Sequence, residues 1–503
     1  MGIILNMKKK LVNIHIGLLL ILAVSLILFI NSSYSPIRDL SYLNHDSMLF
    51  YIIGKGIKYG LVPYKDLIDH KGIYIFLVNY LGAFISEYNH IGIFIVQLII
   101  SYVNFFIIYK IASLFTKDVK VSFLSTLSVF ILQSTNYFCS GAMKCEGFLS
   151  PFIFLSIYIF LKYLLSDNTK YSYKGIFVNG ICAGIVLFTK ANLLLYFVPI
   201  IIILLIKSKS NFYLVLKYFI YGFLGLVVGS APAILYAVLN KCLNEMMYYT
   251  FSVNFLYSSN LYFVYNNYFE AIIGVLYEFK EIIIFSLFSI YLVYKTKKDI
   301  LLYYILLVSS SILVVLIPLR PYSHYANTLV LNLLPVFLVV YTFIFDNLKK
   351  EKTIQKIVLC VSIIIMFISS YKFSWLKTEV DNSRRHIITK ELERLVSNEE
   401  EYDSDKSTLV IGDVIAIYSE LNITPSIRFF GTPYMEKKVF SEPYDEILES
   451  LDKGENKWLV LSFTPLMKEI GFDNEVREAL KGKYELVVED IFIGNEIYRK
   501  IKK

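Results

Sequence analysis

The sequence predicts a polytopic α-helical membrane protein that carries a small α/β domain at its C-terminal end. Of the 503 residues, 56% are hydrophobic and only 18% are charged, whereas ordinary soluble domains have about 25% charged residues. The mean hydropathy is +0.58, and apolar segments recur through the first three quarters of the chain. After Trp375 they give way to short strand-like and helix-like runs. We therefore expect a membrane domain over residues 1–375 and a separate domain over residues 376–503.

The apolar segments predict about eleven membrane spans. The first follows Lys8–Lys10 and resembles a signal peptide, but it lacks a convincing small-residue cleavage site, so we interpret it as an uncleaved helix. The expected spans are residues 14–31, 91–109, 121–138, 148–165, 175–189, 191–206, 213–239, 281–294, 300–317, 325–345 and 355–373.

The distribution of lysines predicts the orientation of these spans. The segment 73–85 is apolar but has the length of an interfacial element rather than of a span. If it does not cross, the lysine-rich short loops all fall on the cytoplasmic side, as the positive-inside rule requires. The N-terminus is then cytoplasmic, and a long first loop (32–90), the loop 240–280 and the C-terminal domain lie outside. Glu146, Lys190 and the segment 320–325 face the same outer side.

The C-terminal domain is predicted from alternating strand and helix patterns. SRRHIITKELERLVSNEEE, YDEILESL and NEVREAL indicate helices, whereas TLVIGD, SIRFF, WLVLSF and YELVVED indicate strands. The sequence IFIGNEIYRK predicts a terminal hairpin that turns at Gly494-Asn495. Such alternation is typical of an α/β domain.

The net charge of +8 does not indicate a nucleic-acid partner, because the lysines lie in short loops between apolar runs and no nucleic-acid-reading motif accompanies them. The five cysteines form no pattern typical of a metal site.

Ionisable residues are concentrated in the stretch NHDSMLFYIIGKGIKYGLVPYKDLIDHKG, residues 44–72. A transferase that uses a lipid-linked sugar needs a carboxylate to activate the acceptor hydroxyl, and cations to meet the departing lipid phosphate. It needs them at the outer membrane surface, where this loop is expected to lie. Asp46 opens a helix-like segment there, and Asp69-His70-Lys71 precede the short apolar helix 73–85.

These motifs resemble the GT-C glycosyltransferases, and most closely the protein O-mannosyltransferase and lipid A aminoarabinose transferase branch. The resemblance covers roughly residues 10–345 and is carried by an Asp soon after the first span, a G-x-x-PY-x-D turn and the DHKG motif. NYFCSGAMKCEGFLSP, GICAGIVLFTKANLLLYFVP and RPYSHYANTLVLNLLP add to it. The sequence departs from the family pattern at Ser47, where many relatives have Glu, and at Gly72, where many have Pro.

The resemblance implies a role for each candidate residue. Asp46 would be the general base, and Glu146 a second acidic residue at the rim of the active site. The substrate-binding residues would be Lys71 at the donor phosphate, with Asp69, His70, Lys190, Arg320, His324 and Tyr325 around the donor.

Structural roles remain open for the same residues. Asp46 can cap the helix that it opens, Asp69 is a residue type typical of turns, and Lys71 can extend toward lipid headgroups. Lys190 can anchor a helix end, Glu146 can be an ordinary loop acid, and tyrosines such as Tyr325 are common at membrane interfaces.

The sequence thus predicts an inverting glycosyltransferase of the plasma membrane that moves a sugar from a polyprenyl-phosphate carrier to an acceptor hydroxyl at the outer membrane face. The acceptor is a lipid, a glycan or a protein, and no cofactor or metal is required, although a divalent metal is not excluded. The alternatives are a polysaccharide polymerase or ligase, and a transporter or flippase of lipid-linked sugars. The polymerase would be expected to have arginines in a large late loop, and the transporter to have charges within its spans or repeated halves.

Overall fold

The structure is a computed structural model that describes residues 2–37, 45–86, 89–139, 141–259, 267–347, 379–397, 408–490 and 494–501. The chain divides into two compact units, each made of three separated segments. Unit 1 comprises Met1–Ile37, Phe94–Pro232 and Ile273–Ser374, and unit 2 comprises Arg38–Ile93, Ala233–Ile272 and Trp375–Lys503.

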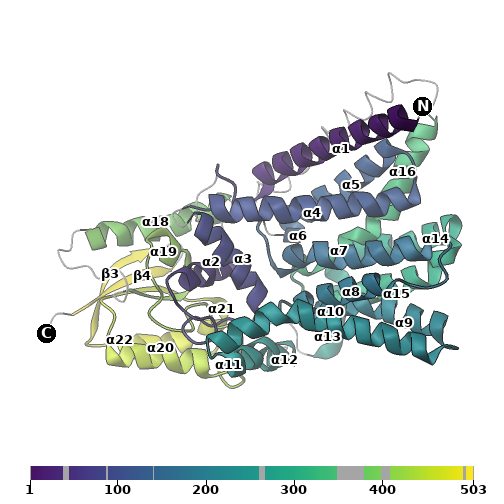
Figure 1. Ribbon diagram of the computed structural model, residues 1–503. Helices are drawn as coiled ribbons and strands as arrows, with labels where there is room; N and C mark the ends of the chain where they lie inside the picture. Colours follow the sequence, from purple (N-terminus) through teal and green to yellow (C-terminus); the bar gives the residue numbers. More distant parts are fainter. Residues whose placement is uncertain are drawn as a thin grey trace. The chain divides into compact units, whose positions relative to one another are not determined.

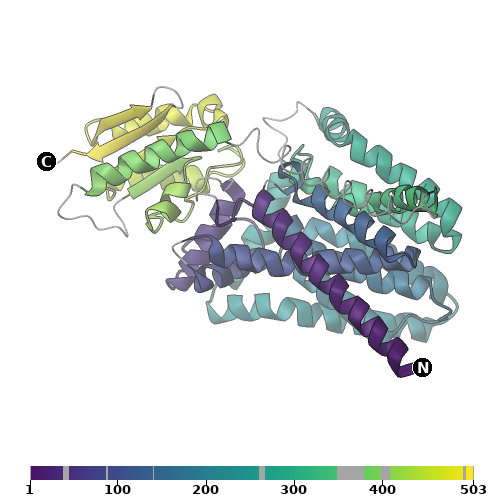
Figure 2. The ribbon, with the colours of Figure 1, turned by 90° about the horizontal axis from the view of Figure 1, so that it is seen from above.

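Unit 1 is helical throughout its described residues, as expected for apolar segments whose backbone polar groups must be satisfied within the chain. Figure 1 shows α4, α7 and α10 running in roughly the same direction, and Figure 2 shows α1 running obliquely to them. The α-helices are α1 (Gly2–Asn31), α4 (Ile91–Phe115), α5 (Val119–Ser134), α6 (Asn136–Cys139), α7 (Cys145–Leu164), α8 (Tyr173–Leu187), α9 (Val198–Ser208), α10 (Phe212–Leu239), α13 (Tyr268–Glu278), α14 (Lys280–Thr296), α15 (Leu301–Leu316) and α16 (Leu334–Asn347). Short 3₁₀ helices are η2 (Ala191–Phe197), η4 (Lys298–Ile300), η5 (Ser323–Ala326) and η6 (Thr328–Leu333).

Six helical segments of the described chain are long and apolar enough to cross a membrane: Ile91–Phe115, Cys145–Leu164, Ala191–Ser208, Phe212–Leu239, Lys298–Leu316 and Thr328–Asn347. Four shorter apolar helices, Gly17–Asn31, Ile73–Ile85, Val119–Ser134 and Tyr173–Leu187, coincide with other predicted segments. The predicted class, a polytopic helical membrane protein with a small C-terminal sheet region, is confirmed. The number of eleven spans stays a prediction, and segment 355–373 lies outside the described residues.

Helices α8 and α10 approach each other through glycines. A Cβ atom on Gly225 would lie 2.1 Å from the carbonyl oxygen of Phe177, and one on Gly180 would lie 2.2 Å from the carbonyl oxygen of Gly222. Gly184 and Gly229 make equally close approaches one turn further along. These are backbone-to-backbone contacts of the small-xxx-small type, which membrane helices use in place of a hydrophobic driving force.

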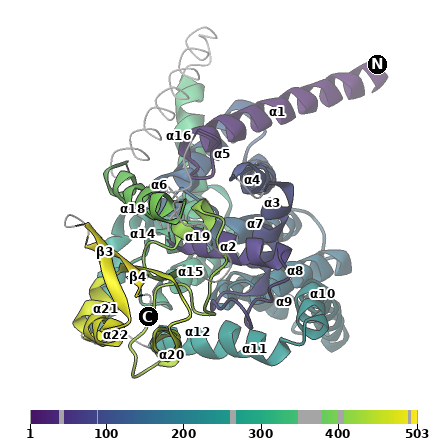
Figure 3. The same ribbon diagram turned by 90° about the vertical axis from the view of Figure 1, so that its left-hand side faces the viewer.

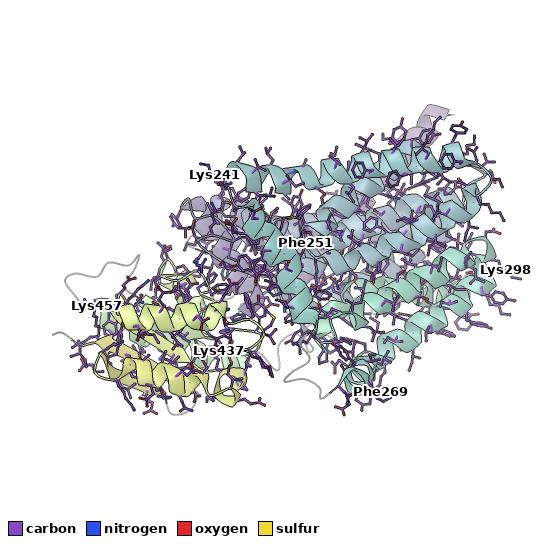
Figure 4. The ribbon with its side chains drawn as sticks, turned by 90° about the horizontal axis from the view of Figure 1, so that it is seen from below. Lys241, Phe251, Phe269, Lys298, Lys437 and Lys457 are labelled. Atoms are coloured by element: carbon purple, nitrogen blue, oxygen red, sulfur yellow. The ribbon has the colours of Figure 1, made fainter. Side chains whose placement is uncertain are left out.

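Unit 2 contains the first loop and the C-terminal segment in one compact body. The first loop forms α2 (His45–Lys58) and α3 (Ile73–Ile85), which pack closely because Gly54 lies against the backbone of Asn79. After Lys241, at the end of α10, the chain forms α11 (Leu243–Met247), the π-helix η3 (Tyr248–Val253), which includes Phe251, and α12 (Asn254–Ser259), as Figure 4 shows.

The C-terminal segment forms a four-stranded sheet in the order β1-β2-β4-β3. The strands are β1 (Thr408–Gly412), β2 (Trp458–Ser462), β3 (Tyr484–Asp490) and β4 (Asn495–Lys500); β1 and β2 are parallel, and β4 is antiparallel to both β2 and β3. Helix α18 (Glu379–Ser397) covers one face, and α20 (Glu442–Lys453) and α22 (Phe472–Leu480) cover the other (Figures 1 and 3). Two short helices, α19 (Ala416–Glu420) and α21 (Pro465–Glu469), complete the domain.

The predicted strand SIRFF, residues 426–430, is wrong. This segment is irregular because its backbone groups bond elsewhere: the Arg428 N–H donates to the Glu446 carboxylate at 2.7 Å, and the Arg428 carbonyl accepts from the Ile68 N–H at 2.9 Å. Pro425 just before it lacks a ladder donor. The segment therefore joins the C-terminal domain to the first loop instead of extending the sheet.

Candidate functional site

In unit 1, a buried carboxylate is paired with a lysine. Glu146 lies in the first turn of α7 and is 2% exposed, and its Oε1 forms an ion pair with the Lys190 ammonium at the junction between α8 and η2. Lys190 Nζ also lies over the Tyr325 ring, 3.8 Å from its centroid. A carboxylate this deeply buried stays ionised only when it is paired. The pair thus explains why the sequence interrupts two apolar runs at residue 190.

A second lysine in the same unit fixes the protonation of His324. Lys144 Nζ lies 3.3 Å from His324 Nδ1. Because an ammonium group has only donors, Nδ1 must accept, and the neutral ring carries its proton on Nε2. The His324 ring stacks against the Tyr322 ring, with the two centroids 5.9 Å apart, and contacts the Tyr325 ring edge-on, with the two centroids 4.6 Å apart.

The segment 320–326 is anchored from the helix core by Asn327. The Asn327 side-chain amide donates to the carbonyls of Gln133 and Phe138 at 3.0 and 3.1 Å, and its carbonyl oxygen accepts from Ser150 at 3.3 Å. Gln133 in turn donates to the Asn327 backbone carbonyl at 3.0 Å. All four residues lie in unit 1. This network holds the 3₁₀ helix η5, and with it His324 and Tyr325, against α5, α6 and α7.

Three cationic side chains of unit 1 are largely buried. Lys144 is 9% exposed, Arg320 is 4% exposed, and the Lys190 side chain is 13% exposed. All three lie in segments that the sequence predicted on the outer face. Lysine and arginine side chains are the groups that proteins use to bind anions such as phosphate.

In unit 2, Asp46 lies in the first turn of α2 and is half-buried. A negative charge at this position interacts favourably with the helix dipole, so the structural role and the predicted catalytic role are compatible. The preceding His45 lies with its Nδ1 3.8 Å from Asp413 Oδ1, and Asp413 accepts a hydrogen bond from Thr432 at 3.0 Å. The C-terminal segment therefore contacts the helix start that carries Asp46.

A tight turn positions the DHKG motif. Tyr64 adopts a left-handed conformation with φ of 72°, and its hydroxyl donates to the Lys71 carbonyl at 2.8 Å. Asp66 closes the turn by accepting from the Val62 N–H at 2.7 Å. Tyr64 is 1% exposed, and burial raises the pKa of its hydroxyl well above the usual 10. An aromatic residue at positive φ is strained, and such strain concentrates at functional sites.

Within the motif, Asp69, His70 and Lys71 contact one another. Lys71 Nζ lies 2.5 Å from His70 Nε2, and His70 Nδ1 lies 3.5 Å from Asp69 Oδ2. Asp69 Oδ1 also accepts from the Lys71 backbone N–H at 2.9 Å, which is the turn role expected of it. Asp69 and His70 are 5% and 6% exposed. The structure thus brings together three of the predicted site residues, of which Asp69 and His70 are buried and Lys71 is half-buried.

Two tyrosine rings contact His70, and they come from distant parts of the sequence. The His70 ring lies 5.3 Å from Tyr257 and 4.5 Å from Tyr434, measured between ring centroids. Tyr257 belongs to the loop 240–280, which the sequence predicted on the outer side, whereas Tyr434 belongs to the C-terminal domain, where no motif pointed to a site. Lys144 was missed as well, although it lies within the NYFCSGAMKCEGFLSP motif, two residues before Glu146.

The contacts within each unit divide the predicted site residues into two groups. Unit 1 brings together Glu146, Lys190, His324 and Tyr325, and places Arg320 in the same buried segment. Unit 2 brings together Asp69, His70 and Lys71, and also contains Asp46. The individual roles of these residues stay predictions.

In the part of the chain that the structure describes, no group of three or more His, Cys, Asp or Glu side chains is arranged to hold a metal ion. The expectation that no metal is required stays a prediction.

The fold is that of a multi-pass membrane protein, and it is similar to the fold of solved structures. It matches ArnT from Cupriavidus metallidurans bound to undecaprenyl phosphate with a TM-score of 0.63 and 10% identity, over 97% of this chain and 98% of that one. The same protein in the apo state matches with a TM-score of 0.56 and 10% identity, over 99% of this chain and 98% of that one. The archaeal oligosaccharyltransferase AglB from Archaeoglobus fulgidus, in complex with an inhibitory peptide and a dolichol-phosphate, gives a TM-score of 0.42 at 10% identity, over 97% and 75% of the two chains.

Residues 70–236 match the family described as dolichyl-phosphate-mannose-protein mannosyltransferase. A comparison with curated protein sequences found no match. The resemblance to GT-C glycosyltransferases predicted from the sequence is thereby confirmed.

Proposed function

We propose that this protein is an inverting glycosyltransferase that moves a sugar from a polyprenyl-phosphate carrier to an acceptor hydroxyl at the outer face of the plasma membrane. The observation that carries the proposal is the fold, which is similar to that of ArnT over 97% of this chain, together with three largely buried cationic side chains, Lys144, Lys190 and Arg320. The ArnT structure with undecaprenyl phosphate supports the same class of donor.

In this mechanism, the Asp46 carboxylate accepts the proton of the acceptor hydroxyl. The hydroxyl oxygen attacks the anomeric carbon of the donor sugar, and the bond between that carbon and the phosphate oxygen breaks on the opposite face. A single displacement inverts the anomeric centre. The lipid phosphate leaves with an additional negative charge, and Lys71 stabilises this charge as it develops.

The experiment is an assay of the purified protein with a panel of radiolabelled polyprenyl-phosphate sugars. We expect the wild type to turn over at least one donor, and Asp46→Asn to lower kcat by about 100- to 10,000-fold, the usual contribution of a general base. Asp167→Asn is the matched control, because Asp167 is exposed in the loop after α7 and its loss should leave turnover unchanged.

Turnover that survives Asp46→Asn would remove Asp46 as the base. If the wild type turns over none of the donors, this result favours the transporter alternative. A flippase assay with a fluorescent lipid-linked sugar in proteoliposomes then becomes the deciding measurement.

A further inference from the structure

His70 is held through its ring and its backbone by separate segments of unit 2. Its ring packs against Tyr257, inclined by 32°, and against Tyr434, inclined by 44°. The two tyrosines also contact each other edge-on, with their ring centroids 5.7 Å apart, so the three rings form one cluster. The His70 carbonyl accepts a hydrogen bond from the Asn254 side chain.

His70 Nε2 lies 2.5 Å from Lys71 Nζ. The Lys71 ammonium can only donate, so Nε2 accepts and the neutral ring carries its proton on Nδ1. His70 Nδ1 lies 3.5 Å from Asp69 Oδ2, so the charge of the carboxylate favours the tautomer that has its proton on this side of the ring.

Contacts at both ends hold the segment that carries Tyr434. Upstream, the Arg428 carbonyl accepts from the Ile68 N–H, and Thr432 bonds Asp413. Downstream, Glu442 at the start of α20 accepts from Tyr248 and Tyr249 at 3.2 and 2.8 Å. All of these contacts lie within unit 2. The C-terminal domain therefore holds Tyr434 in contact with His70.

We infer that His70 is a positioning residue that fixes the Lys71 ammonium through its Nε2, and that Tyr434 of the C-terminal domain holds His70 in place for this task. The inference rests on the proposed function in that Lys71 is taken to bind the donor phosphate. A lysine side chain has four rotatable bonds and loses much conformational freedom when it binds. When His70 Nε2 places the ammonium before the donor binds, less of this freedom is lost on binding. The contact should therefore increase the affinity for the donor.

Two pairs of variants separate positioning from a general structural role. The amide oxygen of a glutamine reaches the place of Nε2, whereas that of an asparagine reaches only the place of Nδ1, so His70→Gln keeps an acceptor for Lys71 and His70→Asn does not. Tyr434→Phe keeps the ring on His70, and Tyr434→Ser removes it. Lys438→Ala is the neighbouring control for a general structural effect: it removes the ion pair of Lys438 with Glu436, whose atoms lie 2.8 Å apart, and it leaves the contacts of Tyr434 with His70 in place.

The primary measurement is the rate at which an amine-acylating reagent modifies Lys71 in the full-length protein, followed by peptide mass spectrometry. We expect His70→Asn and Tyr434→Ser to raise this rate at least threefold, because the ammonium is released. His70→Gln, Tyr434→Phe and Lys438→Ala should stay within a factor of two of the wild type. Equal rates in all variants, or equal increases in His70→Gln and His70→Asn, would overturn the inference.

The second measurement is donor turnover, which separates this inference from the proposed function. We expect KM for the polyprenyl-phosphate sugar to rise about tenfold in His70→Asn and Tyr434→Ser, with a smaller change in kcat. An active wild type whose KM is unmoved by either variant contradicts the positioning role alone. Absence of turnover in every protein contradicts the proposed function, while the acylation rates still decide whether His70 positions Lys71.

Discussion

Glu146 and Lys190 are nearly closed to solvent, with side-chain exposures of 3% and 13%. Charges removed from water in this way are costly when they stand alone and tolerable when they are paired. Tyr325 adds its ring face to the lysine. The pair therefore locks the start of α7 to the junction between α8 and η2.

Breaking this pair should destabilise the protein. Glu146→Gln leaves Lys190 as a buried cation without its carboxylate, and we expect the free energy of unfolding to fall by about 3 kcal/mol. The double variant Glu146→Gln/Lys190→Met should lose less, because it removes both charges. Thermal unfolding of the detergent-solubilised proteins measures the difference as a double-mutant cycle. The cycle includes the single variant Lys190→Met, and a loss in the double variant equal to the sum of the two single losses would mean that the charges do not interact.

At this scale, the sequence identified residue types well and partners poorly. Glu146, Lys190 and His324 stood out because charged and polar groups are rare between apolar runs. Their mutual contacts depend on tertiary packing, so Lys144 beside His324 was not expected. Tyr434 was not distinguishable in sequence from the many other tyrosines, because its contact with His70 joins segments far apart in the chain.

At the scale of elements, α8 and α10 show how small residues determine helix packing. Gly180-xxx-Gly184 and Gly225-xxx-Gly229 are packing contacts, because an added Cβ atom at any of the four glycines would overlap a neighbouring backbone. Short apolar helices such as α3 were also located correctly, because apolar content and length are local properties. The failure at residues 426–430 was of another kind, since the bonds of Arg428 to Ile68 and Glu446 are not local.

Replacing one of these glycines should separate the two helices. In Gly225→Ala, the new Cβ would lie 2.1 Å from the Phe177 carbonyl oxygen, so the backbones must move apart. Overpacking of this kind costs about 1–3 kcal/mol of folding free energy. The control is Gly222→Ala on the same helix, where the new Cβ would lie 3.5 Å from a methyl group of Ile176. We expect a lower Tm for Gly225→Ala than for Gly222→Ala, and the reverse order would contradict this packing.

At the scale of the whole molecule, each compact unit contains segments that are far apart in the sequence. The sequence suggested a domain over residues 376–503 because composition changes there. The structure shows that this segment shares unit 2 with the first loop and with residues 233–272. The reason is the set of polar contacts that Arg428, Tyr434 and Glu442 make with those two segments. A change in composition shows where a chain passes from the membrane into water, but it does not reveal which segments pack together.

The orientation of the whole chain in the membrane follows from its lysines. If α3 does not cross, Lys120 and Lys298 lie on the cytoplasmic side and Lys241 lies outside, as the positive-inside rule favours. A reporter enzyme that is active only outside the cytoplasm should therefore be inactive when fused after Lys120 or Lys298, and active when fused after Lys241. The opposite pattern would mean that α3 spans the membrane. Asp46 would then stay outside, whereas Glu146, Lys190 and Arg320 would lie on the cytoplasmic side, and these residues could not act at one face of the membrane.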